Sequence, residues 1–234
     1  MTNTDLTTRM ATVLHMAPYT CARVTAIALE QAEIEYQTRL VRFVRGEHKS
    51  AAFKRLNPKG KVPALEIDGE VLTENVAILT YLNDRFPEAR LLPVTDAAID
   101  RAKQVADLCF CSATLHPLVT RIRMPMFFAG ADHAATVKQI AMQAMDEYFQ
   151  VVEDRLADSP WWYGSQWSVM DGYLYWIFWR VEGADYDVSR FPRFAAHARA
   201  MEALPTVRRA LDREEQAQAQ LQAEGAAFIP AKVG

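Results

Sequence analysis

Apolar and polar positions repeat with two different periods along the chain, and the change between these periods divides it into two parts. Residues 11–16 form a short apolar run closed by Pro18, which predicts a strand. Apolar residues follow at helical spacing over 21–31, and β-branched and aromatic residues alternate over 34–44, so we expect a helix and a second strand. A strand, a helix and a strand within about 35 residues predict a βαβ unit with parallel strands and a right-handed crossover.

A hairpin and a further helix complete this first part. Residues 62–67 and 70–73 have the composition of two short strands, and the Asp-Gly pair at 68–69 between them is a strong signal for a two-residue hairpin turn. Apolar positions then return to helical spacing over 74–86, where a Phe-Pro pair ends the helix. The first part is therefore expected to be a small βαβ-ββα domain.

The second part is helical throughout. After a linker over 87–96, one long pattern covers 96–128, with Pro117 as a kink inside it, and a second long helix covers 133–156. Pro192 and Pro205 stand where further helices begin, because proline suits the first helical position. From Gln216 the chain becomes rich in alanine and glutamine and is expected to fade towards residues 230–232.

A capping signal marks the most apolar helix of the second part. Ser168 can cap the amide of Asp171, and the Asp171 carboxylate can reach back to the start of the helix. The residues expected to form the buried stripe of this helix are Met170, Leu174, Ile177 and Phe178.

Composition narrows the class of protein. The 234 residues are half apolar, which allows a substantial core, and the net charge of −3 argues against nucleic acid as the default partner. No apolar run reaches the roughly 20 residues of a membrane span, and residues 1–10 lack the apolar stretch of a secretory signal. Three cysteines make no paired framework, and none stands at zinc spacing, so we expect a cytoplasmic protein without a metal.

Cys21 is the first candidate for chemistry, because it stands at the predicted start of the first helix. Unpaired backbone N–H groups and the helix dipole favour an anion at that position, and a thiol there can have a lowered pKa. The same position could stabilise the thiolate of a bound thiol ligand. The alternative is a small buried residue that packs the turn between strand and helix. Tyr19 and Thr20 are the hydroxyl-bearing residues of the same loop.

Two further groups are candidates in other parts of the chain. His116 on the long helix could act as an acid or base near neutral pH, or be a solvated residue beside the Pro117 kink. Glu74 and Asn75 lie in the first turn of their helix, where a carboxylate is favoured by the dipole whether or not it binds anything.

Several motifs together resemble the glutathione transferase family over nearly the whole chain. The most specific are NPKGKVPAL at 57–65 with LTENVAI at 72–78, followed by the SVMD box at 168–171 and FPRFAAHARAMEALPTVRRAL at 191–211. The resemblance implies a thioredoxin-like domain over 1–88, of α/β class, and an all-helical electrophile-binding domain over 96–234. It also implies a homodimer that uses glutathione as a cosubstrate in detoxification.

Around Cys21 and His116 the chain is most similar to the bacterial beta class, which carries a cysteine and a histidine at these points. That class can form a mixed disulfide between its cysteine and glutathione. The sequence departs from the beta class at Ala22, where the class has serine, and at Cys109, where it has asparagine. Tyr19 is the alternative group for activating the thiol.

The resemblance also assigns the glutathione contacts. A cis Val62-Pro63 bond would turn the Val62 N–H and C=O towards the cysteinyl part of glutathione, a local strand addition. Glu74 would then take the γ-glutamyl ammonium, and Asn75 with nearby backbone amides the adjoining carboxylate. Arg45, where the beta class has a ligand-contacting lysine, or Lys61 would take the glycyl carboxylate. For either cation the alternative is a solvated side chain.

The expected activity is transfer of the glutathione thiolate to a small hydrophobic electrophile. A glutathione-dependent thiol–disulfide reductase or peroxidase, or a lyase acting through Cys21, is the second enzymatic possibility. A non-catalytic binding protein on the same fold is the third, since fold alone does not determine activity.

Overall fold

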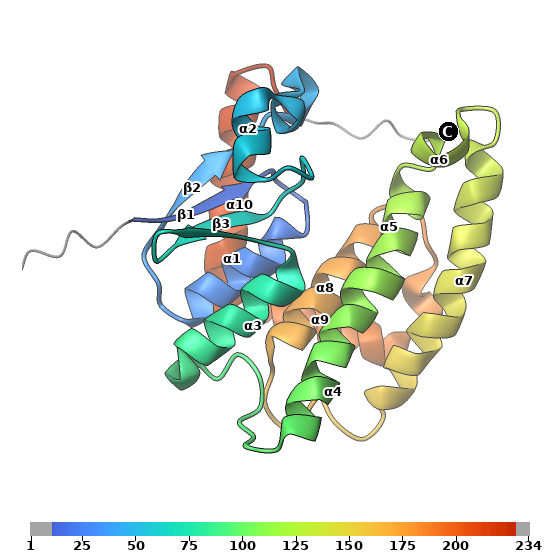
Figure 1. Cartoon of the computed structure of the whole chain (residues 1–234). Coiled ribbons are helices and arrows are strands. Elements are labelled where there is room, and N and C mark those ends of the chain that lie inside the picture. Colours follow the sequence, from blue (N-terminus) through green and yellow to red (C-terminus); the bar gives the residue numbers. More distant parts are fainter. Residues whose placement is uncertain (1–10, 228–234) are drawn as a thin grey trace, which may run out of the picture.

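The computed structural model describes residues 11–227, in which a four-stranded sheet with its helices lies beside a larger group of helices (Figure 1). The strand order is β2-β1-β3-β4. β1 (Thr12–Met16) pairs in parallel with β2 (Tyr36–Leu40), while β3 (Ala64–Ile67) pairs antiparallel with β1 and with β4 (Glu70–Thr73). The parallel pair confirms the predicted βαβ unit, and β3–β4 confirms the hairpin.

The hairpin turn shows why its residues matter. Asp68 and Gly69 both have positive φ angles, +50° and +83°, which aspartate tolerates and glycine adopts freely. The two residues therefore close the β3–β4 hairpin as the sequence predicted.

Helices cover both faces of this sheet. α1 (Ala22–Gln31) and α3 (Asn75–Arg85) lie below it in Figure 1, and α2 (Ala51–Leu56) lies above it. Apolar residues of α1 and α3 join the main core, whereas Phe53 of α2 packs in a separate small cluster with Val41 and Val62. Short 3₁₀ turns complete this half: η1 (Phe43–Arg45), η2 (Glu47–Lys49) and η3 (Pro87–Ala89).

The second half is helical, as predicted. Its elements are α4 (Ala98–Cys109), η4 (Phe110–Leu115), α5 (His116–Arg123), α6 (Met126–Ala129), α7 (Ala134–Arg155), α8 (Val169–Glu182), η5 (Val188–Arg190), α9 (Pro192–Ala203) and α10 (Pro205–Ala223). α8 is buried almost all round and includes the predicted stripe of Met170, Leu174, Ile177 and Phe178. α10 returns to the first half and packs against α1 (Figure 1).

The predicted capping box is present and connects three segments. The Asp171 carboxylate accepts hydrogen bonds from the Ser168 N–H at 2.8 Å and the Ser168 hydroxyl at 2.9 Å. It also accepts one from the Trp162 N–H at 2.7 Å and lies 2.9 Å from Nε2 of His197. Since Asp171 is fully buried, these contacts replace the water that the carboxylate loses. The box therefore holds the loop before α8 and the helix α9 against the start of α8.

The structure differs in four places from the simple element boundaries that the pattern suggests. The second strand ends at Leu40, and the chain continues as 3₁₀ turns and the unpredicted α2, which Ser50 caps by accepting from the Phe53 N–H at 3.1 Å. Six residues are too few to show a helical repeat. α3 begins at Asn75, because Glu74 has a φ angle of +72° that excludes it from the helix.

The other two differences concern long helices. The pattern over 96–128 is not one helix, because the π-helical η4 separates α4 from α5 just before Pro117 and a further break precedes α6. Pro117 has no N–H to donate to the carbonyl four residues earlier, so the regular ladder cannot continue through it. The chain beyond Gln216 stays helical to Ala223, since Ala217 and Leu221 are buried. Residues 230–232 lie outside the described part.

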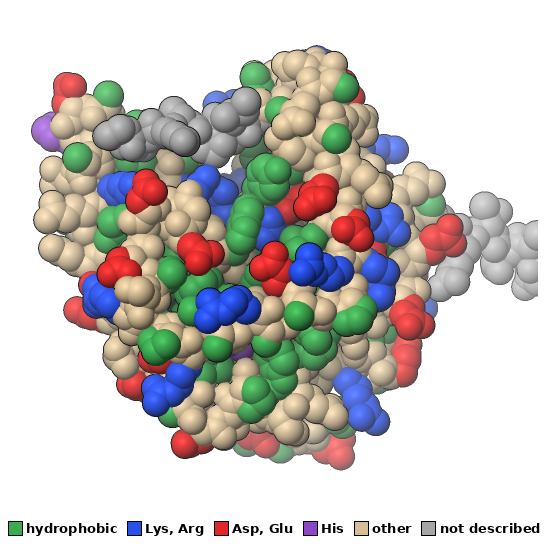
Figure 2. Space-filling view, turned by 180° about the vertical axis from the view of Figure 1, so that it is seen from behind, with side chains coloured by type: hydrophobic (Ala, Val, Ile, Leu, Met, Phe, Trp, Pro, Cys, Tyr) green, Lys and Arg blue, Asp and Glu red, His purple; other side chains and the backbone are tan. Residues whose placement is uncertain are grey.

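Two global properties follow from residues 11–227. No helix in this range is both long and apolar enough to cross a membrane. On the face seen from behind, acidic and basic side chains are interspersed rather than segregated by sign (Figure 2).

Candidate functional site

The loop between β1 and α1 brings Tyr19 and Cys21 to the boundary between the two halves. Tyr19 has a φ angle of +67°, and its N–H donates to the Glu214 carboxylate of α10 at 2.8 Å. Its carbonyl accepts from the Trp176 indole of α8 at 3.3 Å, and its ring lies 5.6 Å from that of Trp179. Burial, with the Glu214 charge, raises the pKa of the Tyr19 phenol. The helical half therefore holds this loop in place.

Cys21 is the N-cap residue of α1, and its Sγ donates to the Val62 carbonyl at 3.7 Å. Burial raises the pKa of the Cys21 thiol from 9.0 to about 12, although the charges of Lys61 and Arg180 act in the opposite direction. The expectation of a lowered pKa at this helix start is therefore wrong. A helix dipole supplies only about 1 kcal/mol, less than one pKa unit, which cannot offset the loss of water around a thiolate.

The segment before β3 is fixed in an unusual path beside this thiol. The Val62-Pro63 peptide bond is cis, and both residues are buried. Asn57, also buried, donates from Nδ2 to the Lys61 carbonyl at 2.6 Å. At Gly60 the φ angle is +63°, and a Cβ would lie 2.8 Å from a backbone oxygen of the preceding turn, so only glycine fits. This arrangement explains the asparagine, the glycine and the Val-Pro pair of the NPKGKVP motif.

Asn75 connects α3 to the start of α1. Its Nδ2 donates to the Cys21 carbonyl at 2.9 Å, and its Oδ1 accepts from the Thr25 hydroxyl at 2.7 Å. The side chain is buried and engaged within the protein. The first amides of α3 have no partner within the helix, so a ligand anion would meet backbone N–H groups there.

Glu74, directly before Asn75, is exposed and carries the strained φ of +72°. Its carboxylate lies 2.7 Å from the Lys59 ammonium, which also donates to the Thr73 hydroxyl at 2.8 Å. Strained non-glycine residues are concentrated at binding and active sites. Glu74 therefore presents its carboxylate at the surface, with a cation already beside it.

His116 faces the same region from α5. Its Nδ1 lies 3.2 Å from the Tyr173 hydroxyl, and its ring packs edge-on against Trp176 at 4.6 Å. Burial, together with the charges of Lys61 and Arg180, lowers the pKa of His116 to about 4. His116 is therefore a neutral imidazole at physiological pH, able to accept a proton only weakly.

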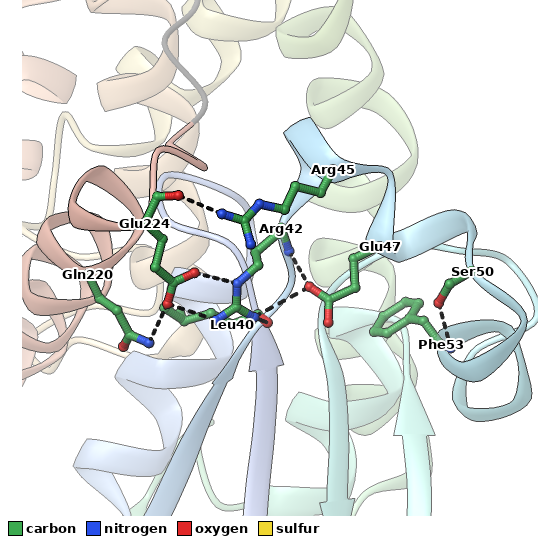
Figure 3. A network of polar contacts seen from close by, with 8 residues as sticks. All are labelled: Leu40, Arg42, Arg45, Glu47, Ser50, Phe53, Gln220 and Glu224. Atoms are coloured by element: carbon green, nitrogen blue, oxygen red, sulfur yellow. Dashed lines mark hydrogen bonds and ion pairs between the residues drawn. The ribbon is translucent and has the colours of Figure 1, made fainter.

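Arg45 lies in a different network. Its guanidinium donates to the Glu224 backbone carbonyl at 2.5 Å, next to Arg42, which forms two hydrogen bonds with the Glu224 carboxylate at 2.5 and 2.9 Å (Figure 3). These contacts tie the turn after β2 to the end of α10. Lys61, by contrast, is exposed, and its charge acts on both Cys21 and His116. Of the two cations proposed from the sequence, Lys61 is the one that the structure relates to the thiol.

The structure adds a group of residues that sequence reasoning missed. Arg23 of α1 forms a buried ion pair with Glu214 and lies 3.7 Å from the centroid of the Trp179 ring. Arg180 of α8 is near enough for its charge to act on Cys21 and His116. The one available signal was a pair of basic residues within otherwise apolar helices, and α8 was interpreted only as core.

Residues 11–227 contain no cluster of three or more His, Cys, Asp or Glu side chains that could hold a metal ion. What the site does contain is a thiol, backbone amides without helical partners at the start of α3, an exposed carboxylate and a neutral histidine. Such a set can bind a small ligand that carries both charges and place its reactive atom at Cys21 and Tyr19.

Two family models match the chain in succession. The model described as "Glutathione S-transferase, N-terminal domain" matches residues 10–84, and "Glutathione S-transferase, C-terminal domain" matches residues 96–213. Among curated proteins, a maleylacetoacetate isomerase of Pseudomonas aeruginosa is 30% identical over 187 residues, which is 79% of this chain and 87% of that protein.

Solved structures agree in fold. A sphingomonad glutathione S-transferase complexed with glutathione has a TM-score of 0.76 at 30% identity, covering 87% of this chain and 98% of that one. A beta class glutathione S-transferase of Sphingomonas chungbukensis has a TM-score of 0.75 at 29% identity, covering 86% of this chain and 98% of that one. The fold predicted from the sequence is thereby confirmed.

Proposed function

The chain belongs to the glutathione S-transferase family, and on that premise we propose that it transfers the thiolate of glutathione to a small hydrophobic electrophile. The observation that carries the proposal is the convergence on Cys21. The Val62 carbonyl accepts from its thiol at 3.7 Å and Asn75 donates to its carbonyl at 2.9 Å, so the cis-proline turn, the α3 start and the α1 start meet at one point.

Glutathione would lie along the Val62-Pro63 turn, with the Val62 backbone pairing with its cysteinyl residue. The Glu74 carboxylate would take the γ-glutamyl ammonium in place of Lys59. The backbone N–H groups at Asn75 and the next residues would take the adjoining carboxylate, because the Asn75 side chain is already bonded. The glycyl carboxylate would lie near Lys61, with Arg45 as the more distant candidate.

The sulfur would then lie at the start of α1, between Cys21 and Tyr19. In the reaction the thiol proton leaves to solvent or to a nearby base, the sulfur forms a bond to the electrophilic carbon, and the leaving group departs with its electron pair. His116 is neutral and, with a pKa of about 4, would serve as a hydrogen-bonding group rather than as the base. Positioning and pKa lowering of the bound thiol carry the catalysis.

One alternative has a specific observation in its favour. A curated relative that matches most of the chain is named maleylacetoacetate isomerase, so a glutathione-dependent isomerase is the second candidate. In either case we propose two units, residues 1–88 for glutathione and 96–234 for the second substrate. A cytoplasmic homodimer active in detoxification is proposed from the family resemblance.

The test is glutathione binding by isothermal titration calorimetry with wild type, Glu74→Gln and, as a matched control, Glu70→Gln on the neighbouring strand. Loss of the charge partner of the ammonium should weaken binding roughly 10-fold or more, whereas Glu70→Gln should bind like wild type. Conjugation of 1-chloro-2,4-dinitrobenzene by the wild type then tests transfer. Absence of measurable glutathione binding by the wild type would refute the proposal.

A further inference from the structure

At the boundary between the two halves lies Arg180, a cation whose side chain has no hydrogen-bond or ion-pair partner among residues 11–227. It lies in the last turn of α8, and its buried Nε has no hydrogen-bond partner among the described residues. Its guanidinium carbon lies 5.8 Å from the Trp179 ring centroid. Arg23, which also lies beside the Trp179 ring, differs because the Glu214 carboxylate neutralises it. Arg180 is half-buried, and burial of its Nε without a partner is costly, so an anion beside the guanidinium would be favourable.

The position of Arg180 on α8 directs it towards the proposed thiol site. Tyr173, Trp176 and Arg180 are spaced by three and four residues, which puts them on one face of the helix. His116 contacts the first two, and the Trp176 indole donates to the Tyr19 carbonyl. Arg180 thus continues, by one turn, the face that meets α5 and the start of α1.

Nearby carboxylates do not satisfy this charge. Glu214 already forms an ion pair with Arg23. Asp185 is largely exposed and lies 4.0 Å from Lys138. A second cation, Arg123, lies beside Arg180 and donates to the Arg180 and Gly183 carbonyls. Burial and these two arginines lower the pKa of Arg180 to about 9, so it remains charged at neutral pH. The helical side of the site therefore carries excess positive charge.

We propose that Arg180 binds a carboxylate of the second substrate, so that the electrophile is an organic acid rather than a neutral compound. The inference rests on the proposed function. It assigns the anion to the second substrate because both carboxylates of glutathione are placed on the first half, at the α3 start and near Lys61. The planar guanidinium suits bidentate pairing with a carboxylate, and the Trp179 ring lies next to it.

A matched pair of electrophiles separates charge from reactivity. In 4-chloro-3,5-dinitrobenzoate the glutathione sulfur attacks C4, the C–S bond forms, chloride leaves with the electron pair, and the thiol proton passes to the buffer. The methyl ester undergoes the same reaction without the carboxylate. Each kcat/KM, divided by the uncatalysed rate constant for that compound, reports recognition alone.

The experiment compares wild type with Arg180→Gln, Arg180→Lys and the control Arg190→Gln, whose side chain is exposed and paired with Asp146. For Arg180→Gln we expect the normalised kcat/KM for the acid to fall roughly 10- to 100-fold, while the ester changes less than about threefold. Arg180→Lys keeps the charge but loses bidentate pairing, so its normalised kcat/KM for the acid should fall between those of wild type and Arg180→Gln. Arg190→Gln should have the same value as wild type. Equal values for the acid in wild type and Arg180→Gln would overturn the inference.

A binding measurement decides the inference independently of turnover. The unreactive 3,5-dinitrobenzoate is titrated into each protein together with S-methylglutathione, and unfolding by circular dichroism confirms that each variant is folded. Its Kd should rise at least 10-fold in Arg180→Gln and stay constant in Arg190→Gln; an unchanged Kd in Arg180→Gln would overturn the proposal. Glutathione affinity is measured in parallel, so a wild type that fails to bind glutathione identifies a failure of the proposed function instead.

Discussion

Cys21 should resist alkylation at neutral pH, and its reactivity distinguishes the mechanisms open to this site. The structure raises the pKa of its thiol to about 12, compared with 9.0 for an ordinary cysteine. At pH 7.5 about 3 in 100,000 of such thiols are ionised, against about 3 in 100 at the ordinary value, a difference of about 1,000-fold. A more basic thiolate is also a better nucleophile, which restores about 20-fold, so the net slowing is roughly 50-fold.

The assay is a time course of iodoacetamide modification at pH 7.5, followed by peptide mass spectrometry. Cys109 is exposed and serves as the internal reference, whereas Cys111 is buried and should remain unmodified while the protein is folded. We expect Cys109 to be modified long before Cys21. Modification of Cys21 as fast as Cys109 would refute the reasoning, because it would show that the helix start stabilises a thiolate despite burial.

The same argument predicts the effect of removing the thiol. If the glutathione sulfur is the nucleophile, Cys21→Ala should keep conjugation of an aryl halide within about threefold of wild type and should lose any disulfide reductase activity. Cys21→Ser is the matched control, since it keeps a hydrogen-bond donor towards the Val62 carbonyl. A loss of conjugation of tenfold or more in both variants, with unchanged glutathione affinity, would contradict this prediction.

Three further predictions concern the scaffold of the site. Asp171→Ala should lower the free energy of unfolding by about 3–5 kcal/mol in urea titrations, because it leaves the buried donors around it unpaired, whereas Asp187→Ala at an exposed 3₁₀ cap should cost about 1 kcal/mol or less. The pKa of His116 is about 4 in the folded state against 6.5 in the unfolded chain, so the unfolded chain binds more protons between pH 4 and 6.5. The free energy of unfolding therefore rises with pH across that window. His116→Gln should remove this rise, which is about 3 kcal/mol at most. Gly60→Ala should cost about 2 kcal/mol or more, because its Cβ would meet the His48 carbonyl at 2.8 Å with φ at +63°, and melting curves identical to wild type would contradict this.

The unpaired cation has a consequence for stability as well as for binding. A half-buried guanidinium whose Nε is buried without a partner disfavours folding, so Arg180→Met should leave the protein as stable as wild type or stabilise it. Residues that lower stability in the absence of ligand are often kept for function. The unpaired state of Arg180 is therefore consistent with a role in binding rather than in folding.

Local rules account for what could be predicted from the sequence. Asp68 with Gly69 specified the hairpin, Ser168 with Asp171 specified the start of α8, and the NPKGKVP segment pointed to the Val62-Pro63 turn. Each depends on residues a few positions apart, so the chain carries the information within one window. The irregularity predicted at Pro117 is present as the π-helical segment η4, which directly precedes α5.

Contacts between distant segments account for what could not be predicted. The Asn75 side chain was expected to meet a ligand, but it bonds Thr25 and the Cys21 carbonyl, 50 and 54 residues away. The Glu74 carboxylate has a lysine partner that its own helix does not supply. Neither partner can be found by periodicity, because spatial proximity of loops is set by the complete fold.

The sequence by itself determined most of the strands and helices, and it pointed to the family and to candidate side chains for binding glutathione. Only the tertiary structure decided the charge states: it removes water around the half-buried Cys21 and His116, which disfavours the charged form of each, and it leaves Arg180 charged without an ion-pair partner among residues 11–227. The helix dipole acts only on groups near the helix end and stabilises a charge there by about 1 kcal/mol. The loss of water depends on every segment that packs around a group, and it shifts the pKa values of Cys21 and His116 by more than two units.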